Sequence, residues 1–232
     1  MNNEVQLSVV IPAFCEEDNL RIILPELKII LENLQIKYEI LVIGPREALD
    51  NSEIACNKIG ATYLRRDRGN SFGDAVRTGI KRAEGQYVIF MDADGSHTPD
   101  FINNLYKKRK EYDVVIASRY VKGGKSENSK ALVFMSSMVN LLYSIALSLN
   151  CKDVSNSFKL YQKSSLKNLK LVSSNFDIVE EILYKLKKAN NDLKICEIPY
   201  FFKNRIAGRS KRNLPLFALS YLFTLIRLRV MK

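Results

Sequence analysis

Two carboxylates separated by one residue, Asp92 and Asp94, directly follow the apolar run 87–91. Carboxylate oxygens suit Mg²⁺ or Mn²⁺, and such ions usually complete their coordination with phosphate oxygens and water. An Asp-x-Asp pair alone is often a solvated turn, but the end of a buried strand fixes both side chains in space. The sequence therefore predicts a metal site at Asp92 and Asp94 that can hold a phosphate-bearing substrate.

An alternation of strands and helices is expected to position these carboxylates. Apolar runs predict strands at 7–12, 38–43, 61–64, 87–91 and 114–118, and helical spacing predicts helices at 20–34, 54–59, 74–83 and 101–110. Helix 74–83 is expected to stop at Gly85 as its C-cap. The alternation indicates an α/β fold with a mostly parallel, doubly wound sheet flanked by helices. Such sheets bind ligands at the carboxyl ends of their strands, where Pro12, Gly44 and Asp92 lie.

An uncharged segment lies between Lys130 and Lys152. Its length is close to the ~20 residues that cross a bilayer. Small polar residues recur in it at every fourth position and so share one helical face: Ser136, Asn140, Ser144 and Ser148. This pattern favours a helix that lies on a membrane or on a protein surface over one that spans the bilayer.

The net charge of +11 is concentrated near the C-terminus, since eight Lys or Arg and no acidic residue follow Ile198. Such a stretch can face nucleic acid, anionic lipid or a phosphorylated substrate. The uncharged run 214–226, closed by Arg227 and Arg229, is typical of an interfacial helix with a basic end or of an amphipathic helix packed on the core. No nucleic-acid partner is expected, because no helix-turn-helix, RNA-binding or zinc pattern accompanies the charge.

The scattered cysteines form no Cys-x-x-Cys pair and are expected to be reduced thiols. The N-terminus lacks a basic region before its apolar run, so no cleaved secretory signal is expected. Together with the basic tail, these features predict a cytoplasmic protein that is peripheral on the inner face of the membrane.

Five blocks in order resemble family 2 inverting glycosyltransferases with the GT-A fold, and in particular the branch of dolichyl-phosphate mannose synthases and polyprenyl-phosphate glycosyltransferases. The blocks are residues 9–20, 92–102, 117–124, 153–161 and 197–211. The likeness runs from about Leu7 to Lys211. It implies a GT-A (Rossmann-like) domain over 1–211, with a nucleotide-sugar half at about 1–120 and an acceptor half at about 121–211. Residues 212–232 then form a basic, amphipathic C-terminal helix that contacts the membrane surface.

The resemblance also implies roles for individual residues. The nucleotide pocket is lined by Pro12, Phe14, Glu16 and Ala93, and the metal is held against the diphosphate by Asp92 and Asp94, with Ser96 nearby. The acceptor's phosphate meets Arg119 and Ser136, and Asp153 faces the sugar or the acceptor. Arg205 and Lys211 belong to a basic segment that closes over the diphosphate. The catalytic residues are then Asp94, Asp153 and Arg205.

Three positions depart from the family pattern: the turn after the second strand, Cys15, and Leu132, which stands roughly where the family has a second acceptor-phosphate arginine and has Lys130 close by as a replacement. The second strand runs into Gly44-Pro-Arg-Glu where the family has an Asp-Asp-Gly-Ser turn, so the base of the nucleotide is left unassigned; Glu47 and Asp67 are candidate replacements, neither in register. Cys15 replaces an Asn and is expected to be a small buried filler. His97, the sole histidine, is expected to be a structural residue of the metal loop and not a base.

The implied activity is inverting transfer of a sugar from a nucleotide-diphosphate sugar to a dolichyl or undecaprenyl phosphate. A phosphate oxygen is already ionised at neutral pH and needs little general-base help, so catalysis rests on positioning and on charge stabilisation of the leaving diphosphate. A glycan or glycolipid hydroxyl is the alternative acceptor, and it would need a base such as Asp153. A non-catalytic paralogue that scaffolds a partner is a third reading, and a membrane-protein subunit is a further expected partner.

Overall fold

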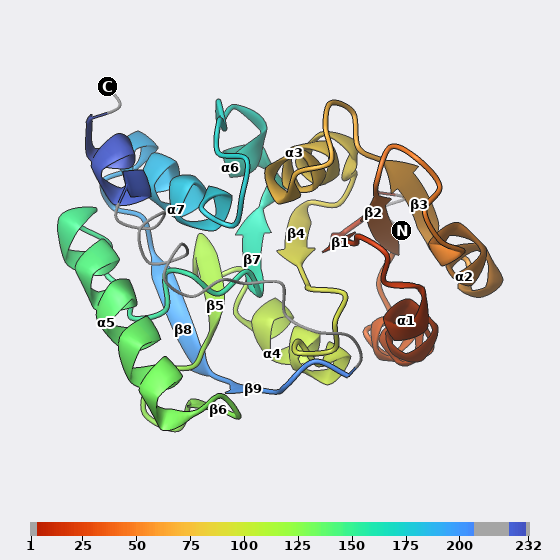
Figure 1. Ribbon diagram of the computed structural model, residues 1–232, viewed down its shortest axis with the longest axis horizontal. Coiled ribbons are helices and arrows are strands. Elements are labelled where there is room, and N and C mark those ends of the chain that lie inside the picture. Colours follow the sequence, from red (N-terminus) through yellow and green to blue (C-terminus); the bar gives the residue numbers. More distant parts are fainter. Residues whose placement is uncertain (1–3, 207–222, 231–232) are drawn as a thin grey trace.

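The computed structural model describes residues 4–206 and 223–230, and its centre is a seven-stranded sheet (Figure 1). The strands lie in the order β3-β2-β1-β4-β7-β5-β8. Their bounds are β1 Leu7–Pro12, β2 Tyr38–Gly44, β3 Thr62–Arg65, β4 Tyr87–Phe90, β5 Val114–Ser118, β7 Lys159–Gln162 and β8 Ile195–Pro199. All neighbours are parallel except β7, which is antiparallel to both β4 and β5. The predicted mostly parallel sheet is thus confirmed.

Helices cover both faces of the sheet and bury two separate apolar cores (Figure 1). One core joins the sheet to α1 (Glu17–Asn33), α2 (Ser52–Ile59) and α4 (Ile102–Lys107), which follows the short turn η1 (Pro99–Phe101). The other joins it to α3 (Phe72–Arg82), α6 (Lys163–Lys167), α7 (Ile178–Ala189) and one side of α5 (Lys130–Ala146). This two-sided burial is why the strands read as continuous apolar runs.

Two predictions about glycine and cysteine were wrong. Helix α3 ends at Ala83, and Gly85 lies beyond it, where a Cβ atom would press on the backbone of Ser8 in β1. Gly85 is therefore required by the close approach of two chain segments and not by a helix cap. Cys15 is exposed and has a φ of +55°, a backbone conformation that Asn adopts more readily than most residues. It fills no core space.

The uncharged segment between Lys130 and Lys152 forms helix α5 only as far as Ala146, and a loop then leads into β7. Ser148, which was expected on the polar helical face, lies in that loop with a φ of +53°. No helix within 4–206 or 223–230 is both long and apolar enough to cross a membrane. Two short strands, β6 (Lys125–Ser126) and β9 (Phe201–Phe202), pair beside the main sheet and bring the chain after β8 back towards the end of β4.

Candidate active site

The first candidate donor residues follow the carboxyl end of β1. Pro12 is its buried last residue, whereas Phe14 is 40% exposed, with the guanidinium of Arg66 5.5 Å from its ring centre. Glu16 accepts a hydrogen bond of 2.6 Å from Asn19 Nδ2. Burial raises the pKa of Glu16, the Asn19 bond and the charge of Arg205 lower it, and the charges of Asp94 and Asp92 raise it, with a net rise. The carboxyl ends of β1 and β4 thus place these acidic residues together.

The loop after β4 fixes Asp92 from both its backbone and its side chain. The backbone N–H of Asp92 donates to Nδ1 of His97 at 2.9 Å. The hydroxyl of Ser157 donates to Oδ1 of Asp92, also at 2.9 Å. His97 is fully buried, as expected of a structural residue, and stacks on Phe158 with ring centres 4.7 Å apart. Burial lowers the pKa of His97, and the charges of Asp92 and Asp94 oppose that shift.

Asp94 is held by its own loop and by a distant arginine. Oδ1 accepts hydrogen bonds from the backbone and the hydroxyl of Ser96 at 3.0 and 2.6 Å, and Oδ2 pairs with Arg205 at 2.8 Å. Burial raises the pKa of Asp94, but the bonds from Ser96 and Arg205 outweigh it and leave the pKa below its usual value. Asp94 is therefore a carboxylate at neutral pH.

The segment that carries Arg205 runs along the Asp94 loop. Ile206 N–H donates to the carbonyl of Asp94 at 2.9 Å, and Lys203 N–H to that of Ser96 at 3.4 Å. Gly95 has a φ of +80°, and a Cβ atom there would meet the side chain of Ile206. Arg205 thus lies at the metal loop as expected, while Lys211 lies outside the described residues. The methyl group of Ala93 is buried in the core.

The carboxylate oxygens of this loop fit a hard divalent cation that is bound by the protein and by a substrate phosphate together. Among the described residues, no group of three or more His, Cys, Asp or Glu side chains could hold a metal ion by itself. Asp92 and Asp94 supply two carboxylates that are 21% and 18% exposed, so both reach the surface of the site. Mg²⁺ in particular is usually held by one or two carboxylates together with substrate phosphates and water.

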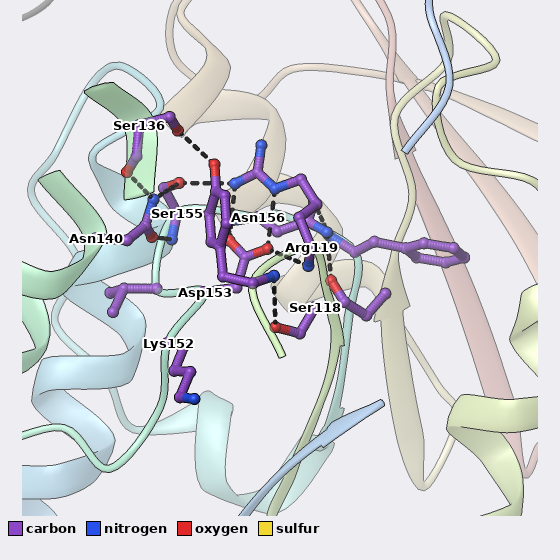
Figure 2. Close-up of polar contacts among 12 residues, drawn as sticks. Ser118, Arg119, Ser136, Asn140, Lys152, Asp153, Ser155 and Asn156 are labelled. Atoms are coloured by element: carbon purple, nitrogen blue, oxygen red, sulfur yellow. Dashed lines mark hydrogen bonds and ion pairs between the residues drawn. The ribbon is translucent and has the colours of Figure 1, made fainter. Parts of the chain in front are cut away.

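The acceptor-side residue Arg119 is bound to Asp153 in a closed ion pair (Figure 2). Nε and one terminal nitrogen of Arg119 donate to the two oxygens of Asp153 at 2.9 and 2.7 Å, and the backbone N–H of Arg119 donates at 2.8 Å. Asp153 is fully buried. Burial raises the pKa of Asp153, but the charge and hydrogen bonds of Arg119 lower it by more, so the pKa is below its usual value. Asp153 therefore lies beneath Arg119, with both oxygens occupied.

The polar face of α5 is turned towards this pair (Figure 2). Tyr120 donates to the hydroxyl of Ser136 at 2.7 Å. Buried Asn140 donates to the carbonyl of Ser136 at 2.8 Å and to the hydroxyl of Ser155 at 3.0 Å, and the same hydroxyl accepts from Arg119 at 3.0 Å. Ser136 and Arg119 are thus brought into one hydrogen-bonded cluster.

The opposite face of α5 is apolar and exposed. Six large side chains form this outer face: Phe134, Met135, Met138, Leu141, Leu142 and Ile145, with exposed fractions from 50 to 70%. The described C-terminal helix, residues 223–230, has the same arrangement, because Phe223, Ile226 and Val230 are exposed while Leu228 is buried. On both helices, large apolar side chains are thus exposed while a polar side chain lies buried against the protein, Asn140 on α5 and Thr224 on the C-terminal helix.

The expected basic end of the C-terminal helix is only partly at the surface. Arg227 turns inward and donates to Asp177 at 2.9 Å and to Ser173 at 2.5 Å, while Arg229 is exposed. The remainder of the expected interfacial helix, 212–222, lies outside the described residues. Arg227 is therefore a docking residue of this helix and not part of a lipid-facing charge.

At the end of β2, neither candidate carboxylate stands free to replace the family's Asp-Asp turn. Glu47 accepts a bond of 2.8 Å from Asn70. Asp67 forms ion pairs with Lys81 and Arg82 of α3 at 2.7 and 3.2 Å. The guanidinium of Arg66 is buried there and donates to the carbonyl of Ala13 at 2.7 Å.

Sequence reasoning missed Asn140, Ser155, Asn156 and Ser157 as parts of the site. Each is a small polar residue, common in loops, and its role depends on contacts with residues far away in the chain. The available signal was their clustering beside Asp153 and on the polar face of the predicted 131–151 helix.

Comparisons with known proteins give a consistent assignment. The sequence profile described as "Glycosyl transferase family 2" matches residues 8–170. A dolichol-phosphate mannosyltransferase of Pyrococcus furiosus is 30% identical over 214 residues, covering 89% of this chain and 59% of that protein. An undecaprenyl-phosphate mannosyltransferase of Micrococcus luteus is 30% identical over 149 residues, 62% of this chain and 60% of that protein. The chain thus spans about three fifths of the length of these relatives.

A solved structure supports the fold assignment. Glucosyl-3-phosphoglycerate synthase from Mycobacterium tuberculosis, in complex with Mn²⁺, uridine diphosphate and glucosyl-3-phosphoglycerate, matches with a TM-score of 0.72 and 18% identity. The match covers 98% of this chain and 81% of that one. The predicted GT-A fold is confirmed.

Proposed function

The chain belongs to glycosyl transferase family 2, and from this premise we propose that it transfers a sugar, with inversion, from a nucleotide-diphosphate sugar to a polyprenyl phosphate. The donor half comprises about residues 1–120 and the acceptor half about 121–211. The names of the two mannosyltransferase relatives point to the same acceptor class.

On the donor side, Asp92 and Asp94 would hold Mg²⁺ or Mn²⁺ against the diphosphate. A divalent cation held there would offset the negative charge that develops on the leaving diphosphate. Arg205, which pairs with Asp94, would add a second positive charge on the same side. Pro12, Phe14 and Glu16 line the nucleotide side, and Lys211 extends the basic segment.

The occupied carboxylate of Asp153 is the observation that carries the choice of acceptor. A sugar hydroxyl needs a base to remove its proton, and Asp153 was the candidate for that role. Both of its oxygens are engaged by Arg119, and it is fully buried. An acceptor phosphate is already ionised, needs no such base, and is attracted by Arg119 with Ser136 beside it. Asp153 then acts as a positioning residue for Arg119.

The outer face of α5 supports delivery of the acceptor from a membrane surface. A polyprenyl tail stays in the bilayer, so its phosphate reaches the enzyme only at the interface. An exposed apolar helix face beside the acceptor cluster can enter the headgroup region while Ser136, on the polar face of the same helix, contacts Tyr120 next to Arg119. The protein is then peripheral on the cytoplasmic face, with a membrane-protein subunit as a further partner.

The acceptor is tested by incubating the protein and Mn²⁺ with a panel of nucleotide sugars and with undecaprenyl or dolichyl phosphate. Lipid products are read by mass spectrometry, and the Asp94→Asn variant serves as the inactive control. We expect a glycosylated lipid phosphate with at least one donor. Turnover on a glycan but on no lipid phosphate would replace the proposed acceptor, and no turnover with any acceptor would favour a scaffolding role.

Membrane docking is tested by placing a charge on the outer face of α5. We expect Ile145→Lys to reduce co-sedimentation with vesicles of neutral phospholipid at least about tenfold, because a charged residue no longer enters the apolar layer. Ile29→Lys is the matched control, since Ile29 is also more than half exposed but lies on α1. Equal binding of both variants would contradict docking through α5.

A further inference from the structure

One short loop, residues 153–157, contacts both the Arg119 cluster and the loop that carries Asp92. Asp153 and Ser155 hold Arg119, and Ser155 also accepts from Asn140 of α5. Asn156 and Ser157 turn the other way: Asn156 contacts His97 and Ser157 contacts Asp92. The acceptor arginine and the metal loop are therefore fastened to the same five residues.

The contact between His97 and Asn156 has a defined direction. Nδ1 of His97 accepts the backbone N–H of Asp92, so the proton of the neutral ring must sit on Nε2. Nε2 then donates to Oδ1 of Asn156 at 3.0 Å. The amide of Asn156 is oriented by its own donation from Nδ2 to the carbonyl of Ala117 at the end of β5. A continuous chain of bonds thus runs from β5 to the backbone of Asp92.

Burial makes this chain hard to replace with water. His97 is fully buried and Asn156 is 3% exposed. Three aromatic rings surround the imidazole: Phe158, Tyr200 and Phe202. A buried donor or acceptor that loses its partner is strongly disfavoured, so the ring nitrogens favour one orientation of the loop.

We propose that Asn156 and His97 are positioning residues for the metal site, which hold Asp92 in place through the N–H···Nδ1 bond while Ser157 orients its carboxylate. This inference rests on the proposed function, in which Asp92 and Asp94 bind the metal. Partners of this kind, one bond removed from the ligand, typically change metal affinity about 10–100-fold when removed.

The first measurement uses the fact that His97 is the sole histidine. In protein labelled with ¹⁵N-histidine, the imidazole gives one pair of nitrogen signals, which reports the tautomer without any metal. We expect the Nε2–H tautomer in the wild type and a change in both nitrogen shifts in Asn156→Ala. Ser8→Ala, which removes a fully buried hydroxyl near the start of β1 and outside the site, is expected to leave both signals unchanged.

The second measurement is the binding of Mn²⁺ in the presence of uridine or guanosine diphosphate, followed by electron paramagnetic resonance. We expect Asn156→Ala to weaken Mn²⁺ binding about 10–100-fold, with the loss of turnover largely restored by raising the Mn²⁺ concentration. Ser157→Ala, a smaller change, should weaken binding severalfold without changing the tautomer. Ser8→Ala should keep wild-type Mn²⁺ affinity.

The outcomes separate the two levels of inference. Unchanged Mn²⁺ affinity in both Asn156→Ala and Ser157→Ala, with wild-type protein binding Mn²⁺ normally, would overturn the positioning role alone. An Nδ1–H tautomer in the wild type would overturn it as well. Failure of wild-type protein to bind Mn²⁺ with either nucleotide would overturn the metal site of the proposed function, and the positioning role with it.

Discussion

Two Asp–Arg pairs lie at the carboxyl edge of the sheet, at nearly equal separations of 2.8 Å for Asp94–Arg205 and 2.7 Å for Asp153–Arg119. Their surroundings differ. The side chains of the first pair are 18% and 32% exposed, whereas those of the second are 0% and 11% exposed. Arg205 reaches Asp94 from a segment that returns after β9, while Arg119 gives Asp153 its backbone N–H as well as its guanidinium.

The two ion pairs differ in whether their members can change partners: Asp94 and Arg205 can, whereas Asp153 and Arg119 form part of the folded scaffold. Asp94 and Arg205 remain partly solvated, so either can take a new partner at modest energetic cost. Asp153 has no access to solvent, and separating it from Arg119 would leave a buried charge without compensation. We therefore infer that the first pair exchanges partners when the substrate binds, whereas in the second pair Asp153 positions Arg119.

The largest effect is expected from breaking the buried pair. Asp153→Ala should lower the free energy of unfolding by about 3–5 kcal/mol, because Arg119 is left without its buried partner. Urea unfolding measures this change. Asp94→Ala, the matched variant of the exposed pair, should lose less than about 1 kcal/mol. Equal losses would show that the two pairs do not differ in the way proposed.

The next effect concerns the metal site. Asp94→Asn should reduce turnover on the order of 10²–10³-fold while the protein stays folded, because a ligand is lost where charge develops on the diphosphate. Steady-state kinetics over a range of Mn²⁺ concentrations measure this effect. Tight, metal-independent donor binding by this variant would contradict the metal assignment.

A smaller effect is expected from Arg205→Gln, which should raise the affinity for Mn²⁺ and lower turnover. Removing the guanidinium frees an oxygen of Asp94, so Mn²⁺ alone should bind more tightly than in the wild type. Turnover should nevertheless fall about 10–100-fold, since a charged hydrogen bond to the diphosphate is lost. A fall in both quantities would indicate that Arg205 supports the loop and does not compete with the ion.

The smallest effect is the pH dependence of the buried pair. The pKa of Asp153 is lowered in the folded protein, so the ion pair stabilises fully above the unfolded value near 4 and its contribution is lost as the pH falls through the folded pKa. The difference in unfolding free energy between wild type and Asp153→Asn should be constant above about pH 5 and narrow below about pH 4. Urea unfolding from pH 3 to 7 tests this, and a difference that widens in acid would contradict it.

The parts of the fold that the sequence predicts well are those where burial is uniform. Strands β1 and β5 have the predicted bounds, because every residue in each is buried. Strand β7 was not predicted. It begins with Lys159, whose ammonium group is fully buried and donates to the carbonyls of Val154 and Asn156. A charged residue inside a strand interrupts the apolar pattern, and only the tertiary contacts explain it.

The candidate site likewise has parts that the sequence predicts and parts that it does not. The Asp92 and Asp94 pair was predictable because a strand end and its loop lie in one short stretch of sequence. The state of Asp153 was not, since its partner Arg119 lies 34 positions away and nothing in either motif indicates that they bind each other. Similarly, the polar face of the α5 helix was visible in the sequence, but which side of it met the protein was not.

The reversed direction of β7 has a consequence for engineering and for divergence within the family. Because β7 runs against β4 and β5, the loop 153–157 enters the sheet at the catalytic edge and is fixed there by the register of Lys159 with Phe90 and Ile116. Its other end is fixed by Glu197, which accepts the backbone N–H groups of Lys152 and Asp153. The loop is thus held rigidly at both ends, and because it also positions Arg119, we expect that replacing it with the loop of a relative changes the acceptor preference on an unchanged scaffold.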